Sequence, residues 1–299
     1  MLVEKEVRFK RAENAAILGM GANIALAIFK WVIGVHSGSK ALIADAIHSA
    51  SDVAGSLAVY IGLIAAKRPP DEDHPYGHGK AELIAAIIVA VFLFFVGIEI
   101  FISSFQSLFQ PVEAPKVYAI IAVIVSILVK EGMFRYKFKL GKELNSDALI
   151  VNAYEHRSDV YSSLAALIGI GSAIIGGKLG LNWLEYADPV IGLVVAFMIL
   201  HMAFQLGKEA IHNTMDHVLS PEASSYLFSA VDKVEGIKRI EELHAREHGH
   251  YLIIDLKIAV DPSLTVEDGH LIVKNAKEKL MAFHQVQNVF IQMIPYDHT

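Results

Sequence analysis

The chain has 299 residues, and 54% of them are apolar, a larger share than soluble globular proteins usually carry. The formal net charge of -6 argues against a nucleic-acid partner, because phosphate binding needs a concentrated basic surface. Cysteine is absent, which excludes disulfides and thiolate metal sites and leaves imidazole and carboxylate as the strong metal ligands. These properties predict a membrane protein without nucleic-acid function.

Six apolar stretches occupy the first two thirds of the chain. A helix needs about 20 apolar residues to cross a bilayer, and each stretch approaches or exceeds that length. The fourth reaches it only with an amphipathic continuation to residue 138. We therefore predict six transmembrane helices, at residues 15–35, 41–66, 83–108, 117–138, 148–175 and 190–206.

Basic residues are unevenly distributed between the predicted spans. They gather at the amino terminus, between the second and third spans, and between the fourth and fifth, whereas the alternate loops hold only Lys40, Lys116 and Lys178. Basic loops stay on the cytoplasmic side of a membrane. The pattern predicts a multi-pass protein with both termini in the cytoplasm, and we expect it in the plasma membrane of a prokaryote.

The segment after residue 206 is more charged and has shorter periodic elements. The pattern predicts a helix at 220–234, strands at 237–246 and 250–260, a second helix at 266–283 and a last strand at 288–295. Residues 1–206 are therefore predicted to form a six-span transmembrane domain. Residues 207–299 are predicted to form a cytoplasmic α+β domain.

Two predicted spans carry ionisable residues that share helical faces. Asp45, His48 and Asp52 are spaced by three and four residues, and Glu155 and Asp159 are four apart. At a rise of about 1.5 Å per residue, Asp52 and Asp159 both lie near the middle of a ~30 Å hydrocarbon core. Ionisable residues at that depth are costly and usually line a functional path.

Two interpretations of these residues remain open. Ligands from two antiparallel helices at one depth can form a four-coordinate site for a first-row divalent metal. Alternatively, the side chains only form ion pairs between helices, with His156 and Arg157 neutralising Glu155 and Asp159. We favour the metal site.

Three segments carry a family resemblance. HSASDVAGS from His48, DEDHPYGHGKAE from Asp71 and NAYEHRSDVYSS from Asn152 are similar to signature segments of the cation diffusion facilitator family of metal/proton antiporters. The resemblance extends over nearly the whole chain, including the span count and the tail. It implies a transport site made of His48, Asp52, Glu155 and Asp159, with Asp45 and His156 as possible auxiliary ligands.

The chain departs from the family at Glu155, where members commonly have His. One imidazole and three carboxylates form a harder ligand set than two of each, which shifts relative preference toward manganese and iron(II), although zinc binds most such sites tightly. We favour manganese over zinc or iron(II). His156, beside Glu155, remains an alternative ligand.

The loop after the second span holds a second candidate metal site. Asp71, His74 and His78 have suitable spacing, and family members with matching residues bind metal in this loop. Solvated surface residues are the alternative. Lys80 resembles a family lysine that pairs with an aspartate after the last span, here Asp216; the alternative is a lysine that only follows the positive-inside rule.

The tail resembles a ferredoxin-like, metallochaperone-like domain that dimerises and, in some members, binds metal. Glu241, Asp255 and Gln292 stand where other members have His, and only His270 matches clearly. A weak metal site at Glu241, Asp255 and His270 is therefore expected at most. A replacement site from His244, His248 and His250 is the alternative, and a domain that only forms a homodimer is a third interpretation.

The sequence thus predicts a divalent-metal efflux transporter that exchanges manganese, zinc or iron(II) for protons and has no prosthetic group. An intramembrane metalloenzyme is the rival from another class, but no HExxH segment is present and an enzyme site would need an open coordination position. A membrane scaffold that binds metal without transporting it is the third possibility. We expect a transporter and not an enzyme.

Overall fold

The computed structural model describes residues 2–66, 68, 70–144, 147–249 and 251–297. The chain forms two compact units, Met1–Leu57 with Val89–Gln205, and Ala58–Ile88 with Leu206–Thr299. Residues between the second and third predicted spans therefore group with the C-terminal residues, and α2, α3 and α7 each continue from one unit into the other.

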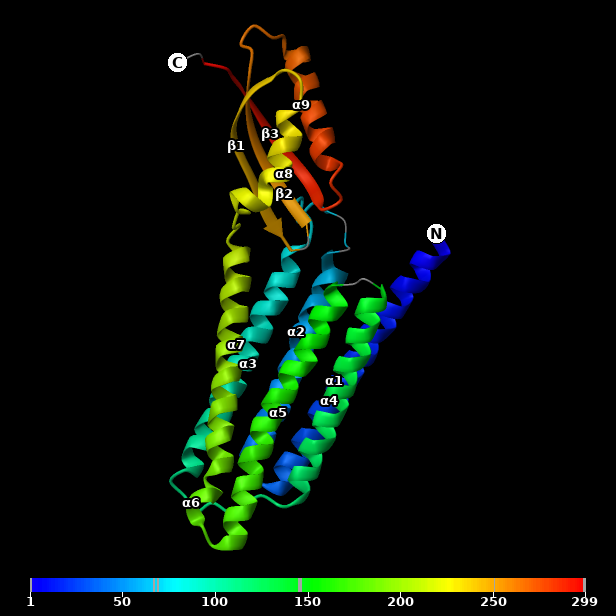
Figure 1. Ribbon diagram of the computed structural model, residues 1–299. Helices are drawn as coiled ribbons and strands as arrows, with labels where there is room; N and C mark the ends of the chain where they lie inside the picture. Colours follow the sequence, from blue (N-terminus) through cyan, green and yellow to red (C-terminus); the bar gives the residue numbers. More distant parts are fainter. Residues whose placement is uncertain (1, 67, 69, 145–146, 250, 298–299) are drawn as a thin grey trace. The chain divides into compact units, whose positions relative to one another are not determined.

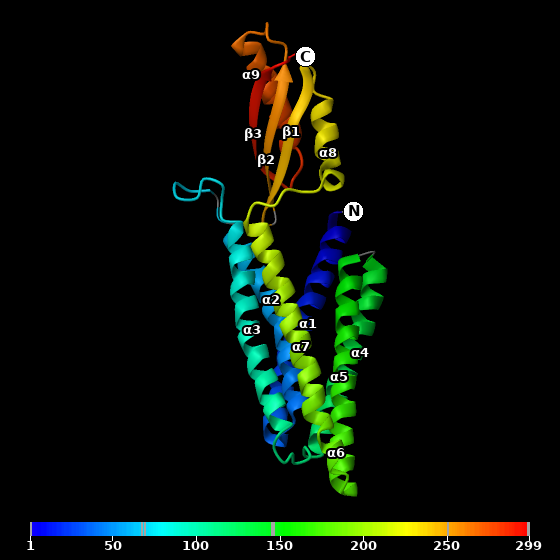
Figure 2. The ribbon, with the colours of Figure 1, turned by 90° about the vertical axis from the view of Figure 1, so that its left-hand side faces the viewer.

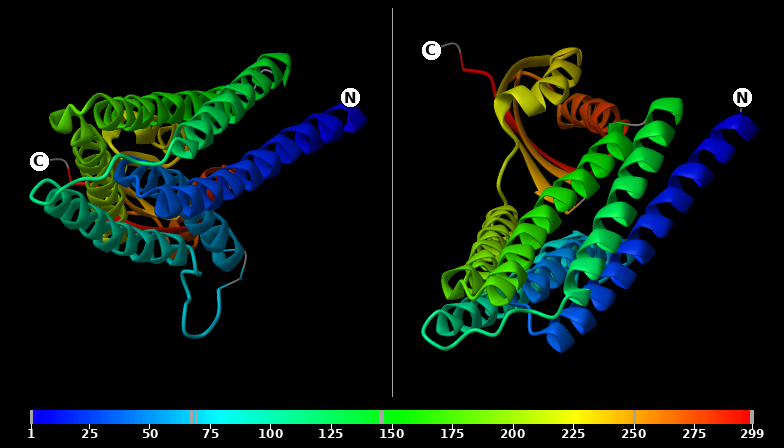
Figure 3. Two further views of the ribbon diagram at one scale, coloured as in Figure 1. Left: turned by 90° about the horizontal axis from the view of Figure 1, so that it is seen from below. Right: turned by 60° about the horizontal axis from the view of Figure 1, so that its bottom comes forward.

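The first unit is built from long helices (Figure 1). Its helices α1, α4 and α5 lie side by side (Figure 3). Helix α4 contacts both α1 and α5. The short α6 leads into α7. The bounds are α1 Leu2–Ser37, α2 Lys40–Ala66, α3 Lys80–Ser107, α4 Tyr118–Leu144, α5 Asp147–Leu179, α6 Asn182–Glu185 and α7 Ala187–Thr214.

Helix α2 lies at the centre of the packing in this unit. On one side, Leu42 is buried in a cluster with apolar residues of α4 and α5. On the other side, Ala44 packs with Ile100 of α3 and Ile199 of α7. Close packing on two faces fixes the rotation of α2 about its axis, and with it the direction of the polar side chains one turn further along.

The turn between α1 and α2 explains how α2 begins. Gly38 has a φ of 75°, a left-handed conformation that suits glycine. The Ser39 hydroxyl then accepts a hydrogen bond from the Leu42 amide at 3.0 Å, and the Asp188 carboxylate accepts one from the Lys40 amide at 2.6 Å. Both bonds satisfy amides that a helix N-terminus leaves unpaired.

The described residues include four helices that are long and apolar enough to cross a membrane, at Ile17–Ser37, Lys80–Ser107, Asn152–Leu179 and Asn182–Thr214. The protein is thus a multi-pass helical membrane protein. Large apolar side chains such as Phe95 on α3 and Phe197 on α7 are exposed, as lipid contact requires. Helices α2 and α4 are also long, but they are not among these four, so the count of six spans stays a prediction.

The second unit contains a small α+β domain (Figure 2) whose elements follow the predicted order. The sheet has the order β1-β2-β3, with β1 antiparallel and β3 parallel to β2. The parallel pair is connected through α9. The bounds are α8 Pro221–Asp232, β1 Ile237–His248, β2 Tyr251–Val260, α9 Val266–Met281 and β3 Val286–Pro295.

Both helices of this domain contribute to one apolar core. Leu227 of α8 and Leu280 of α9 are fully buried together with Ile254 and Ile258 of β2. Side chains cap the starts of both helices. The Ser220 hydroxyl accepts a hydrogen bond from the Ala223 amide at the start of α8, and the Thr265 hydroxyl accepts one from the Asp268 amide at the start of α9. The prediction of an α+β tail is therefore confirmed.

Candidate transport site

Three ligating side chains from two helices lie together in the first unit. The ligand atoms of His48 and Asp52 on α2 and of Asp159 on α5 all lie within 4.8 Å of one another. His48 Nε2 is 3.8 Å from Asp159 Oδ1, and both side chains are largely buried. Three of the four side chains predicted for the transport site therefore share one place, at a spacing that one cation could bridge.

Buried lysines of α1 and α4 reach these two helices. Lys130 of α4 forms an ion pair with Asp159, and Lys130 is fully buried. Lys30 of α1 pairs with Asp45 at 2.8 Å. The structure thus places Asp45 in an ion pair outside the His48 group, which differs from the predicted auxiliary role.

The other three predicted residues of α5 take separate positions. Glu155 is exposed and accepts a hydrogen bond from the Asn152 side chain, so it lies outside the three-residue group. His156 is 2% exposed, and neither ring nitrogen has a hydrogen-bond partner among the described residues. Arg157 stacks on the Phe134 ring at 4.7 Å. Asp159 thus pairs with Lys130 and lies 3.8 Å from His48, whereas the ion-pair interpretation expected His156 and Arg157 to neutralise Glu155 and Asp159.

Sequence reasoning missed Lys30 and Lys130. Lys30 lies inside the first apolar stretch, so the rule that singled out Asp52 and Asp159 could have found it. Lys130 begins the charged continuation of the fourth stretch and resembles an interfacial lysine. Only the packing of α4 against α5 shows that its ammonium is directed inward.

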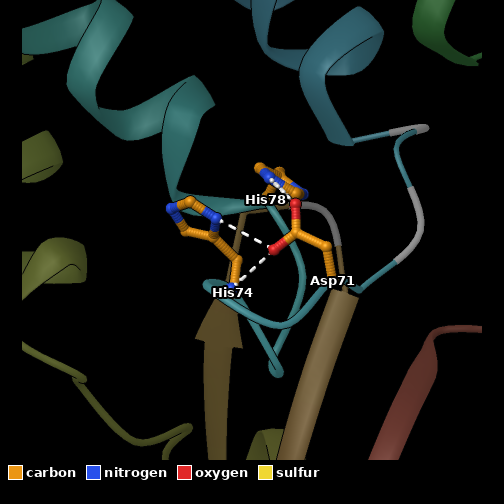
Figure 4. Close-up of side chains that lie close together, drawn as sticks. All are labelled: Asp71, His74 and His78. Carbon is orange, nitrogen blue, oxygen red and sulfur yellow. Dashed lines mark hydrogen bonds and ion pairs between the residues drawn. The ribbon is translucent and has the colours of Figure 1, made fainter.

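The loop residues form a second group, in the second unit (Figure 4). Asp71 lies between two imidazoles: Asp71 Oδ1 is 3.2 Å from His74 Nδ1, and Asp71 Oδ2 is 3.3 Å from His78 Nε2. The hydrogen bond from the His74 backbone amide to Asp71 lowers the pKa of that carboxyl below its ordinary value. An ionised carboxylate with two imidazoles beside it is a suitable ligand set for a divalent cation.

A chain of charges follows the end of α7. Lys80 Nζ lies 3.0 Å from Asp216 Oδ1, the pair that the sequence analysis considers. Arg246 of β1, which sequence reasoning missed, lies 3.7 Å from Asp216 and 2.9 Å from Asp255 of β2. Arg246 thereby links the end of α7 to the sheet. Its ion pair also involves Asp255, which is one of the metal ligands predicted in the tail.

The remaining tail residues are dispersed. Glu241 is paired with Arg239 on its own strand, and His270 lies exposed on α9. Within the residues that the structure describes, neither group of potential metal ligands includes a tail residue. His244 faces Asp255 across the strands and lines a cavity of about 310 Å³ with it. His250 lies outside the described residues.

The membrane unit has several spans and holds acidic and imidazole ligands between its helices, and a small α+β domain follows it in the chain. This combination is typical of a membrane transporter for cations. Residues 16–213 match the cation efflux transmembrane domain, and residues 219–296 match the cation efflux protein cytoplasmic domain. The chain therefore belongs to the cation efflux family, also called the cation diffusion facilitator family. Its members are transporters, so the prediction of a transporter and not an enzyme is confirmed.

Three relatives are similar over nearly the whole of this chain. The manganese efflux system protein MneP of Bacillus subtilis is 36% identical, over 95% of this chain and 96% of that protein. The manganese efflux system protein MneS of the same organism is 29% identical, over 99% of both. Metal tolerance protein C1 of Arabidopsis thaliana is 34% identical, over 96% of this chain and 63% of that protein.

Proposed function

We propose that the protein exports manganese(II) from the cytoplasm in exchange for protons, with zinc and iron(II) as competing substrates. The observation that carries the proposal is the approach of His48, Asp52 and Asp159 to within 4.8 Å of one another between two helices of the membrane unit. The manganese efflux proteins among the relatives support the choice of metal.

The ligand chemistry favours a hard divalent cation. Two carboxylates and one imidazole offer more oxygen than nitrogen, which shifts relative preference toward manganese. These groups bind metal only when they are deprotonated, so metal and protons compete for them. Competition of this kind is the basis of exchange: a proton gradient drives release of the metal on the side where protons are more abundant.

The fourth ligand position has two candidates on α5. Glu155 stands where the family commonly has a ligand, and turning its side chain inward requires loss of its hydrogen bond from Asn152. His156 is already buried with both ring nitrogens unpaired among the described residues, and it lies three residues before Asp159. We favour Glu155 because a third carboxylate strengthens the preference for manganese.

The remaining assignments belong to the same proposal. Residues 1–206 form six spans in the plasma membrane of a prokaryote, with both termini in the cytoplasm, as the distribution of basic residues indicates. Residues 207–299 form a cytoplasmic domain that holds a homodimer, and Glu241, Asp255 and His270 add at most a weak metal site. Asp71, His74 and His78 form a second metal site that does not transport, and the Lys80–Asp216 pair ties the start of α3 to the end of α7.

Metal flux into proteoliposomes tests the proposal. The wild-type protein should move manganese against a proton gradient, and excess zinc and iron(II) should compete in separate assays. Asp52→Ala and Asp159→Ala should abolish flux, because each removes one of the few ligands without changing the apolar packing. Asp45→Asn is the matched control: it alters a buried carboxylate of the same helix outside the group and should retain metal binding. Wild-type flux in both Ala variants would contradict the site.

A further inference from the structure

Lys130 has an unusual environment for a lysine. It lies in the interior of the membrane unit and is fully buried. Among the described residues, its ammonium has one partner, the Asp159 carboxylate. A buried ammonium that uses one of its three donors is poorly satisfied, and the partner carboxylate is one of the three gathered ligands.

The neighbouring Lys30 pair shows what a saturated ion pair looks like in the same unit. Lys30 Nζ donates to the Asp45 carboxylate at 2.8 Å, to the Asp45 carbonyl at 3.2 Å and to the Ser49 hydroxyl at 2.7 Å. Hydroxyls of Ser162 and Ser163 donate to the two Asp45 oxygens, each at 3.0 Å. Every donor of this ammonium is used. The contrast indicates that Lys30 is held in place, whereas Lys130 is bound through one separable contact.

We propose that Lys130 is a tethered counter-cation of the transport site, which neutralises Asp159 before metal binds and is displaced from it by the incoming divalent cation. The inference rests on the transport site proposed above and adds a specificity-determining residue to it. Lys130 lies on α4, a helix that supplies no predicted ligand.

The physical reason is competition for one carboxylate. An unpaired carboxylate at this depth is costly, so a lysine on the adjacent helix stabilises the helix bundle while the site is unloaded. A divalent cation at Asp159 would face the lysine's positive charge within a few ångströms, and at low dielectric this repulsion is strong. Metal binding therefore has to move the ammonium aside. The lysine weakens metal affinity and favours metal release.

The test measures manganese binding to the purified full-length transporter at one fixed pH of 8, together with flux. Lys130→Gln should bind manganese about tenfold or more tightly than wild type, because the competing charge is removed. Flux should show a lower KM and a lower maximal rate, since release becomes slow. Lys130→Arg keeps the charge and should bind no more tightly than wild type. Lys30→Gln is the matched control and should leave manganese affinity within about threefold of wild type.

The outcomes separate the inference from the function it rests on. If wild type neither binds nor transports metal, or if Asp159→Ala binds normally, the proposed function fails. If those results hold but Lys130→Gln binds with unchanged or weaker affinity, only the Lys130 inference is overturned. Should Lys130→Gln be unstable alone, saturating manganese must restore its cooperative melting, because the metal replaces the missing charge; a variant that stays unfolded with manganese also overturns the inference.

Discussion

The Tyr251 hydroxyl of β2 joins the sheet to the loop that precedes α3. It accepts a hydrogen bond from the Gly79 amide at 3.0 Å and donates one to the Tyr76 carbonyl at 2.9 Å. Burial raises the pKa of Tyr251 above its ordinary value of 10, so the hydroxyl keeps its proton at neutral pH. One side chain therefore bonds to the backbone on both sides of Gly77 and His78, and His78 belongs to the loop group.

Tyr251→Phe should loosen this loop while leaving the sheet intact. It removes one hydroxyl and two hydrogen bonds, at a cost of about 1 kcal/mol in the local opening equilibrium, or about fivefold. Hydrogen exchange of the loop peptide in the full-length protein measures the effect. Phe290→Leu, which alters a ring beside Tyr76 without removing a hydrogen bond, is the control. Equal exchange in wild type and Tyr251→Phe would show that the hydroxyl contributes nothing.

Gly79→Ala should lower the stability of the protein, although it adds only one methyl group. A Cβ at this position would lie 2.0 Å from the His248 carbonyl oxygen and 2.8 Å from the Tyr251 ring. Such overpacking costs about 1–3 kcal/mol. Thermal melting of the full-length protein should detect the loss. Gly132→Ala on α4, which meets no heavy atom within 4 Å, should be neutral or slightly stabilising because alanine favours a helix. Equal melting temperatures for the two variants would contradict the close approach.

Acid should destabilise the second unit through His248. Burial lowers the pKa of His248 below its ordinary value of 6.5, and the nearby Lys80 ammonium lowers it further. The unfolded chain then takes up this proton at higher pH than the folded chain does. Folding free energy is therefore lost as pH falls from about 6.5 toward the folded pKa.

Melting temperatures between pH 7.5 and 5 check this dependence. His248→Gln should flatten the curve in the acid range, whereas His270→Gln, at an exposed position of α9, should leave it as in wild type. A wild-type curve that does not change when His248 is replaced would rule out this residue as the source.

Glu155→His should raise zinc flux relative to manganese flux. The substitution replaces an oxygen ligand with an imidazole, which softens the ligand set. The ratio of the two metals in the proteoliposome assay is the measurement, and Glu131→His, on α4, is the control for a general effect of added histidine. An unchanged ratio, combined with loss of flux in His156→Ala, would identify His156 as the ligand in place of Glu155.

The tail should dimerise without metal. A fragment that begins at residue 207 keeps the complete apolar core of the α+β domain, and Arg246 already occupies Asp255. We expect manganese or zinc to change its melting temperature little. A real site at 100 times its Kd would add about 2.7 kcal/mol, which is on the order of 10 °C or more for a domain of this size. A shift of that size that disappears in His244→Ala or His270→Ala would make the tail a metal sensor.

The sequence alone determined the elements whose signals are local. The apolar runs and the periodic patterns of the tail each act within a few residues, so the order of the tail's helices and strands could be read before the structure. The spacing of His48 and Asp52 also placed both on one face of α2, because a helix turns by about 100° per residue whatever surrounds it.

Only the tertiary structure decided which side chains meet across helices. Glu155 and His156 are neighbours on α5 and differ by about 100° in direction, so the packing of α5 selects which one is buried. Lys130 is far from Asp159 along the chain, and the Tyr251 hydroxyl is further still from Gly79. These contacts depend on the rotation of each helix about its axis and on the fold of the sheet. Close packing of many residues determines both, and no local sequence pattern shows either of them.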